Sequence, residues 1–366
     1  MEPRTPIDAT HTPGDLSSVF KITTSGSYYL VANIDTGRSL GAGIIRLAES
    51  GIRVSASDVT IDLNGFTISG GTNDLSGISV DSGLKGITIR NGHINGFGVD
   101  GINADGVNCG LYENLCLDNN KDDGLEVGSD TVIRNCRAVG NGDMGFVANS
   151  GVTITESVAQ GNGDDGFLVG AAGVISRCVS RSNEGYGINA ATACSISHCS
   201  VLDNRNDGIF ASQRGNISDC IVMSNGRRAS TLGLGVGIRV IFAGMVKHCV
   251  VDLNGGAGIK CAFPIGGSGG GAVHVIENEV TNNANQGVLC ETGGNRIEGN
   301  SFIANSGPAV QNIVGGNIVI KNNSISNFGA GTVDDYDMHA GDIRGPIITG
   351  PGVIAAGANP WANFVQ

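Results

Sequence analysis

Residues 133–146, IRNCRAVGNGDMGF, contain the pattern that decides the fold. An isoleucine and a short alternating segment lead to an asparagine, and a glycine followed by an apolar residue closes the pattern. The glycine–apolar pair recurs every 21 residues from Gly124 to Gly208, and again from Gly237 to Gly258. A fixed period of this kind is typical of a repeat protein in which each unit packs on its neighbours.

Equivalent positions of successive repeats carry the same kind of side chain. The residue after the glycine is apolar in Leu125, Phe146, Phe167, Ile188, Ile209, Ile238, Ile259 and Val288. A second apolar column follows in Ile133, Ile154, Ile175, Ile196, Ile217 and Val246. An asparagine column contains Asn141, Asn162, Asn183, Asn204, Asn225, Asn254, Asn283 and Asn305. Alternation over such short segments predicts short strands stacked at the ~4.8 Å spacing of neighbouring strands. The sequence therefore predicts an all-β parallel β-helix of about a dozen coils.

The repeat also resembles a known family. The segments IRNCRAVGNGDMGF and IENEVTNNANQGV (residues 276–288) are similar to the right-handed β-helix repeat of pectate lyases, polygalacturonases, alginate C5-epimerases and phage tailspikes. The resemblance covers residues 59–328 and implies a right-handed, single-stranded parallel β-helix of the pectate-lyase-like superfamily. The lead EPRTPI, with GSYYL and VTIDLNGFTI, resembles a branch of secreted bacterial β-helix proteins, most of them without an assigned activity. This resemblance implies a secreted or periplasmic protein, and we expect its signal peptide to be missing from this sequence.

The ends of the chain depart from the repeat, and an open strand edge needs covering. We expect residues 1–40 to form an N-terminal cap, residues 41–328 the parallel β-helix, and residues 329–366 a C-terminal cap or strap. The only tryptophan, Trp361, belongs to this last segment. We expect it to be an apolar anchor rather than a platform for a sugar ring.

Composition excludes several classes of partner. The net charge is −12 and the isoelectric point about 4.8, whereas a nucleic-acid-binding protein needs a basic surface. No run of 18 apolar residues occurs, so no membrane-spanning helix is expected. The sequence does not indicate an oligomeric state.

Five of the ten cysteines occupy one column of the repeat, twelve residues after the opening glycine. They are Cys136, Cys178, Cys199, Cys220 and Cys249, and Ser157 fills the remaining place. In-register side chains on stacked strands are about one strand spacing apart, which exceeds the ~3.8 Å between Cβ atoms that a disulfide prefers. We expect buried free thiols that act as small apolar side chains.

No catalytic motif of the related enzymes is present. Asp164–Asp165 superficially matches the D-D pair of polygalacturonases, but their N-T-D, G-H-G and R-I-K motifs are missing, as is the D-P-H-D motif of alginate epimerases. Catalytic residues therefore cannot be carried over from these families, and whether the chain is an enzyme stays open.

Aspartates gather at the corners that precede the repeat glycines: Asp122, Asp123, Asp143, Asp164, Asp165 and Asp207. Stacked carboxylates could bind Ca²⁺, a hard cation that takes six or more oxygen ligands. The alternative is ordinary turn chemistry, in which the aspartate side chain accepts local backbone N–H groups.

A second polar row stands eleven residues after the glycines and contains Glu156, Arg177, His198, Asp219 and His248. We consider Arg177, His198 and His248 as substrate-binding residues, because histidine can exchange protons near neutral pH. A solvated ladder of alternating charges explains the same row.

The period breaks twice, and these breaks suggest a site. Eight extra residues separate Asn225 from Gly237, and eight more follow Cys261. The two insertions should flank one strand face, on which Arg239 and Lys260 lie on adjacent coils about 5 Å apart. Like charges in this position repel unless an anion lies between them.

The candidate catalytic residues are therefore Arg239, Lys260 and Glu291, with Arg227 and Arg228 of the first insertion as substrate-binding residues. Such a set could neutralise the carboxylate of an acidic polysaccharide and remove the adjacent proton. The alternative is a pair of surface cations beside long loops.

Two classes of function remain. The first is an extracellular lyase, epimerase or hydrolase that acts on an acidic polysaccharide. The second is a non-catalytic structural, adhesive or glycan-binding stalk. In both, a polysaccharide is the partner, and Ca²⁺ is a possible but not a required cofactor.

Overall fold

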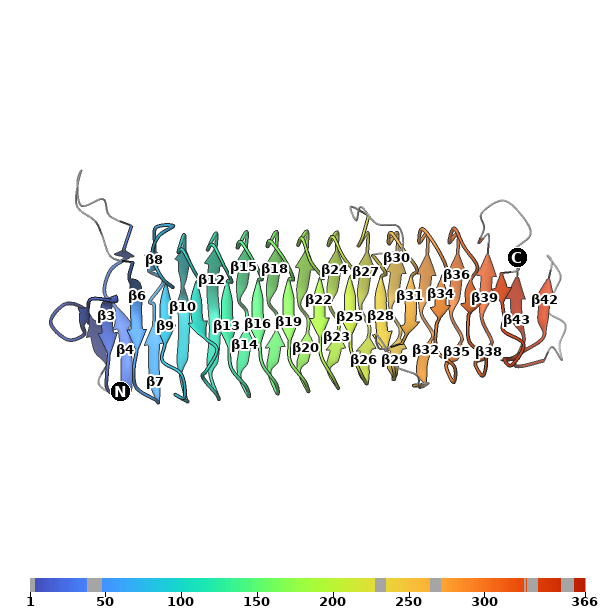
Figure 1. Ribbon diagram of the computed structural model, residues 1–366, viewed down its shortest axis with the longest axis horizontal. Coiled ribbons are helices and arrows are strands. Elements are labelled where there is room, and N and C mark those ends of the chain that lie inside the picture. Colours follow the sequence, from blue (N-terminus) through green and yellow to red (C-terminus); the bar gives the residue numbers. More distant parts are fainter. Residues whose placement is uncertain are drawn as a thin grey trace. The chain divides into compact units, whose positions relative to one another are not determined.

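The computed structural model describes residues 4–37, 48–227, 235–263, 271–325, 327, 335–349 and 359–365. It consists of two compact units, Met1–Val174 and Ile175–Gln366, and each is built from coils of short strands (Figure 1). Most coils contribute one strand to sheet B and two to sheet A, whereas Thr88–Asn95 and Leu111–Asp118 of the first unit are single longer strands of sheet A. None of the described residues forms a helix that is long and apolar enough to cross a membrane.

In the first unit, sheet B contains β2 (Pro13–Asp15), β3 (Ser18–Ile22), β6 (Ser50–Val54), β9 (Ile78–Val80), β11 (Ile102–Ala104), β13 (Leu125–Val127), β16 (Phe146–Ala148) and β19 (Phe167–Val169). Sheet A contains β1 (Thr5–Ile7), β4 (Gly26–Leu30), β5 (Ile34–Asp35), β7 (Val59–Asp62), β8 (Thr67–Ser69), β10 (Thr88–Asn95), β12 (Leu111–Asp118), β14 (Val132–Arg134), β15 (Arg137–Val139), β17 (Thr153–Thr155) and β18 (Val158–Gln160). Strand β20 (Val174–Ser176), also of sheet A, includes residues of both units.

In the second unit, sheet B contains β22 (Ile188–Ala190), β25 (Ile209–Ala211), β28 (Ile238–Ile241), β31 (Ile259–Ala262), β34 (Val288–Cys290), β37 (Val310–Asn312) and β40 (Tyr336–Asp337). The first strands of sheet A in this unit are β21 (Val179–Arg181), β23 (Ser195–Ser197), β24 (Ser200–Leu202), β26 (Gly215–Ser218), β27 (Ile221–Met223), β29 (Gly244–Lys247), β30 (Val250–Asp252), β32 (Val273–Ile276) and β33 (Glu279–Thr281). The remaining ones are β35 (Arg296–Glu298), β36 (Ser301–Ile303), β38 (Ile318–Ile320), β39 (Asn323–Ile325), β41 (Ile343–Arg344), β42 (Ile347–Thr349) and β43 (Asn363–Val365).

The register of these strands equals the period of the sequence. Leu125 faces Phe146 in parallel strands of sheet B, and Ile133 faces Ile154 in sheet A. The side chains of all four residues are buried, as are those of the predicted inward columns in the second unit. The rings of Phe146 and Phe167 stack with centroids 5.0 Å apart. The predicted parallel β-helix and its core columns are therefore confirmed.

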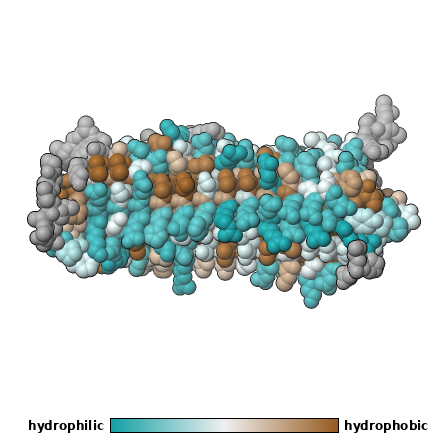
Figure 2. Space-filling model, turned by 180° about the vertical axis from the view of Figure 1, so that it is seen from behind, coloured by the Kyte–Doolittle hydropathy of each residue, from teal (hydrophilic) through white to brown (hydrophobic). Residues whose placement is uncertain are grey.

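Stacking of equivalent positions also organises the surface. Figure 2 shows hydrophobic and hydrophilic side chains in separate bands over the coils. Each band arises because successive coils place the same sequence column at the same point of the circumference.

The turn between the two sheet A strands of a coil contains one residue in the left-handed conformation. In unit 2 the residues at this place include Arg177 (φ 53°), His198 (φ 55°), Asp219 (φ 56°) and His248 (φ 53°). The predicted polar row is thus a row of corner residues. Asparagine, aspartate and histidine adopt this conformation more readily than other residues with a side chain, so the arginine here carries some backbone strain.

The asparagine column forms a ladder of buried side chains. In unit 1, Asn120 Nδ2 donates to Asn141 Oδ1 at 3.0 Å, and Asn141 Nδ2 donates to Asn162 Oδ1 at 3.0 Å. Each oxygen also accepts the backbone N–H of the preceding rung, and each amide donates to a backbone carbonyl of the preceding coil, as from Asn141 to Leu117 at 3.1 Å. Donors and acceptors of every internal rung are thus satisfied, which makes an uncharged polar group tolerable in the core.

The cysteine column is buried as predicted, and all ten cysteines are free thiols. Cys199 Sγ lies 3.3 Å from the carbonyl oxygen of Ser197, and Cys136 makes the equivalent contact with Arg134. Burial raises the pKa of Cys136 to about 12, so this thiol stays protonated and unreactive.

Strand pairing continues on both sides of the predicted cap boundaries. Near the N-terminus, β3 pairs in parallel with β6 and β4 with β7, while β2 and β3 form an antiparallel pair. Near the C-terminus, β40 pairs with β37 and β43 with β39. Residues 38–47 and 328–334 lie outside the described residues, so the boundaries at residues 40 and 328 stay predictions.

Replacement of Asn204 by alanine should lower the free energy of unfolding by about 2–3 kcal/mol, because the backbone N–H of Asn183 and the carbonyl of Ser180 lose a buried partner. Urea unfolding followed by circular dichroism measures this change. Replacement of the exposed Asn216 on β26 is the matched control and should change the free energy by less than about 0.5 kcal/mol. Equal effects of the two substitutions would contradict the importance of the ladder.

Thiol titration should separate the cysteines by burial. In the native protein, an aromatic disulfide reagent should modify the exposed Cys109 first and the half-buried Cys116 more slowly, and should leave the eight buried thiols unmodified. All ten should react after denaturation without reductant. A lower total would reveal a disulfide and would contradict the assignment of free thiols.

Candidate functional site

Arg239 and Lys260 are neighbours, as the sequence predicted. They face each other in the parallel register of β28 and β31 and point outward from sheet B. Their side chains are only 19% and 17% exposed. The predicted basic strand face therefore exists in the second unit, but it is partly covered.

Each of these cations has its own carboxylate. Arg239 Nε lies 2.6 Å from Asp207 Oδ2, and Lys260 Nζ lies 2.8 Å from Glu291 Oε1. The Asp207 side chain also accepts the backbone N–H of Val236 at 2.8 Å and is almost fully buried. An anion is therefore not needed to separate Arg239 from Lys260, and an anionic ligand would compete with two existing ion pairs.

The predicted loop residues can be placed only in part. Arg227 is exposed and lies in the corner after β27, while Arg228 lies outside the described residues, as do residues 229–234 and 264–270. The first insertion lies between β27 and β28, and so it precedes a strand of sheet B. The second lies between β31 and β32, and so it follows the sheet B strand of the next coil. That the two insertions flank one strand face thus stays a prediction.

An aromatic pair stands beside the cations. Phe210 is in register with Arg239 on the outer face of sheet B, and its ring centroid is 5.4 Å from that of Tyr186. Neither residue of this pair was predicted from the sequence. The sequence did contain a signal for Phe210. It follows Gly208 by two residues, and Arg239 and Lys260 occupy the same outward position in their own coils.

The other predicted substrate-binding residues lie in a different corner of the coils. Arg177, His198 and His248 occupy turns between the two strands of sheet A, whereas Arg239 and Lys260 lie on sheet B. His248 is 3.0 Å from Glu277 Oε2 and 3.5 Å from Asp219 Oδ1. The structure places this row apart from the basic strand face, and the contacts of His248 agree with a ladder of exposed charges.

The corner aspartates of the first unit form an acidic cluster on sheet B. Carboxylate oxygens of Asp100, Asp122 and Asp123 lie within 4.8 Å of one another, a donor set that could hold Ca²⁺. Asn103 Nδ2 donates to Asp100 at 2.7 Å and to Glu126 at 3.0 Å. Burial, together with neighbouring carboxylates, raises the pKa values of Asp123 and Glu126 to about 7.

The same aspartates have the structural role that turn chemistry implies. Asp100 Oδ1 accepts the backbone N–H of Asp123 at 3.1 Å, and Asp123 Oδ1 accepts that of Met144 at 2.8 Å. Each carboxylate thereby links one coil to the next. The cluster could hold a cation, but the coils already need its aspartates for these links.

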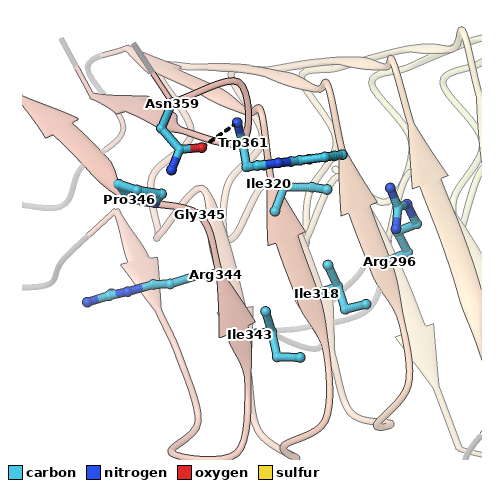
Figure 3. Close-up of a pocket in the computed structure, with 9 residues that line it drawn as sticks. All are labelled: Arg296, Ile318, Ile320, Ile343, Arg344, Gly345, Pro346, Asn359 and Trp361. Carbon is cyan, nitrogen blue, oxygen red and sulfur yellow. Dashed lines mark hydrogen bonds between the residues drawn. The ribbon is translucent and has the colours of Figure 1, made fainter. Parts of the chain in front are cut away.

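A pocket of about 400 Å³ opens in the second unit near the C-terminus (Figure 3). Trp361 borders it, and its backbone N–H donates to Asn359 Oδ1 at 2.9 Å. The other residues that line it are Arg296, Ile318, Ile320, Ile343, Arg344, Gly345 and Pro346. The lining is therefore partly aliphatic and partly polar, and among its isoleucines Ile320 is buried whereas Ile343 is exposed.

Trp361, which we expected to be an apolar anchor, is only half-buried. The tryptophan is 48% exposed, and the ammonium group of Lys321 lies 4.5 Å from the centroid of its ring. Arg296 and Lys321 both pair with Glu298, at 2.6 and 2.7 Å, whereas Arg344 on β41 is exposed. The position of the tryptophan could not be derived from the repeat, because residues 359–365 lie beyond its last regular coil.

Two solved structures illustrate what this chain is similar to. The A-module of mannuronan C-5 epimerase AlgE4 from Azotobacter vinelandii is 16% identical with a TM-score of 0.56, and the match covers 82% of this chain and 87% of that one. The Dettilon tailspike protein is 11% identical with a TM-score of 0.50, and the match covers 79% of this chain and 60% of the tailspike. At these identities the likeness establishes the fold.

A search of curated proteins finds no match. The family model of the right-handed β-helix region matches residues 41–173 and 146–263, which together make up more than half of the sequence. The chain therefore belongs to the family of right-handed β-helix proteins.

Proposed function

We propose that this β-helix protein binds a polysaccharide outside the cell and that the Trp361 pocket holds one of its sugar rings. The observation that carries the proposal is a half-exposed tryptophan that borders a pocket of about 400 Å³ also lined by isoleucines. A sugar ring has apolar C–H faces that pack on aromatic and aliphatic side chains, while its hydroxyl groups need polar partners at the rim. Asn359 and Arg344 supply such partners.

The rim favours an acidic sugar. Arg344 is exposed, and a guanidinium group can bind a carboxylate through two parallel hydrogen bonds. Arg296 adds positive charge on the other side of the pocket, although it is paired with Glu298. The substrate in the name of the similar epimerase, mannuronan, is a polymer of an acidic sugar, which agrees with this proposal.

Titration with alginate oligosaccharides should change the intrinsic fluorescence, because the single tryptophan lies in the pocket. The Arg344→Ala variant should bind about tenfold more weakly, which corresponds to the loss of ~1.4 kcal/mol. Added salt should weaken binding to the wild type, since an exposed charge pair is screened.

Replacement of Arg214, an exposed arginine of the same unit, changes the net charge equally and should leave the affinity unchanged. An unperturbed tryptophan at saturating oligosaccharide would contradict the pocket. A similar loss in both arginine variants would point to a nonspecific charge effect instead.

The basic strand face is a second candidate site for the same polysaccharide. The register of Phe210 with Arg239 favours it, because an aromatic ring beside charged groups suits a sugar that carries a carboxylate. Arg239, Lys260 and Glu291 are the catalytic residues that we propose for a lyase or epimerase reaction. In such a reaction a base removes the proton next to the sugar carboxylate while a cation stabilises the developing charge. Arg227 would contact the chain from the first insertion.

The double variant Arg239→Ala, Lys260→Ala should lose at least ~100-fold of any lyase or epimerase activity, since both the cation and the base would be missing. Assays follow unsaturated products by ultraviolet absorbance and C5 inversion by proton NMR. Binding at the Trp361 pocket, measured by fluorescence, should persist.

Because Asp207 loses its partner in this variant, Lys260→Gln serves as a milder second variant. Wild-type protein that binds alginate without turning it over would favour the non-catalytic stalk and would contradict the catalytic assignment.

A further inference from the structure

His93, Cys116 and Asp118 lie together on the outer surface of sheet A in the first unit. His93 on β10 and Cys116 on β12 face each other in the parallel register. Asp118 is two residues beyond Cys116 on the same strand, so its side chain emerges on the same face. The imidazole nitrogen, the thiol sulfur and a carboxylate oxygen all lie within 4.8 Å of one another.

The carboxylate of Asp118 lies at the centre of this cluster. His93 Nε2 is 2.8 Å from Asp118 Oδ2, and Cys116 Sγ is 3.4 Å from each Asp118 oxygen. A nucleophilic cysteine needs its thiol hydrogen bonded to a base such as imidazole. Here the thiol and the imidazole both turn to the carboxylate, so the arrangement does not favour a nucleophile activated by histidine.

We propose that His93, Cys116 and Asp118 bind a Zn²⁺ ion. Zn²⁺ accepts thiolate, imidazole and carboxylate ligands together, whereas Ca²⁺ and Mg²⁺ prefer oxygen ligands alone. Bond lengths of ~2.0–2.3 Å and tetrahedral angles place zinc ligands about 3.3–3.6 Å apart. The sulfur and the carboxylate already have this separation, and the imidazole must move by about 0.5 Å to admit the ion.

The position of the cluster in the sheet suits a site with an open coordination position. All three residues are half-buried, so one side of the cluster faces solvent. Asn95, which faces Asp118 across the strands, lies 3.5 Å from the same His93 Nε2, so this contact is lost when the nitrogen binds the ion. Three protein ligands with water in the fourth position are typical of catalytic rather than structural zinc sites.

Charged side chains lie on both sides of the thiol. Cys116 contacts Asp118 of its own strand and faces Arg137 on β15. Zn²⁺ binds the thiolate form of cysteine, so each bound ion should release the thiol proton.

The test uses the full-length reduced protein without a histidine tag. Calorimetric titration with Zn²⁺ in two buffers of different ionisation enthalpy should show one tight site per chain and the release of a proton. Titration with Co²⁺ should give the thiolate-to-cobalt charge-transfer band. Cys116→Ser and His93→Gln should each weaken Zn²⁺ binding at least ~100-fold and remove or shift that band.

Two variants control for other metal ligands. Cys109→Ser removes the exposed thiol, and His11→Gln removes a histidine that pairs with an aspartate but has no cysteine beside it. Both should bind Zn²⁺ as the wild type does. Circular dichroism verifies that each variant is folded, and Cys116→Ala replaces the serine variant if that one unfolds.

Wild-type binding no tighter than that of Cys116→Ser would overturn the proposal, as would a cobalt spectrum without the sulfur band. Loss of binding in Cys109→Ser would assign the ion to another thiol. These outcomes are independent of polysaccharide binding, since the Trp361 pocket belongs to the other unit.

Discussion

The hydrogen bonds between stacked asparagine side chains fix the register on which the rest of each unit depends. A rung such as Asn204 accepts two hydrogen bonds from Asn183 and donates to Asn225 and to a backbone carbonyl, so that a coil displaced by one residue would leave several buried polar groups unpaired. Because the register is fixed, every other column of the sequence becomes a row in space. The core rows, the Arg239–Lys260 pair and the His93–Cys116 pair all follow from this one constraint.

The sequence period was sufficient to predict rows but not the contacts between different rows. Glycine, isoleucine and asparagine columns predicted the strands, the buried face and the proximity of Arg239 to Lys260. The ion pair between Arg239 and Asp207 joins an outward strand position to a corner position of the preceding coil, and its formation depends on side-chain lengths and burial rather than on period. The Trp361 pocket lies where the repeat ends, so columns give no information about it.

Charge compensation within the protein changes how its surface can recognise a ligand. The net charge of −12 and the ion pairs of Arg239 and Lys260 leave little uncompensated positive potential on the strand face. Recognition of an acidic polymer would then depend on local shape and on a guanidinium that is free to pair, rather than on long-range attraction. Arg344, which is exposed and lines the same pocket as Trp361, satisfies this requirement better than the paired cations do.

The ladder also has a consequence for the chemical durability of the protein. Four rungs, Asn141, Asn162, Asn225 and Asn254, precede a glycine, and Asn-Gly is the dipeptide most prone to deamidation through a cyclic imide. The glycines at 142 and 163 are needed because a Cβ there would approach a carbonyl oxygen of the preceding coil within 2.0–2.1 Å. Deamidation requires the glycine nitrogen to attack the side-chain carbonyl, yet the Gly142 N–H is bound to Asn120 O at 2.8 Å and the amide is held on both sides. The folded coil thus protects its Asn-Gly pairs from deamidation, and we expect this reaction mainly in the unfolded chain.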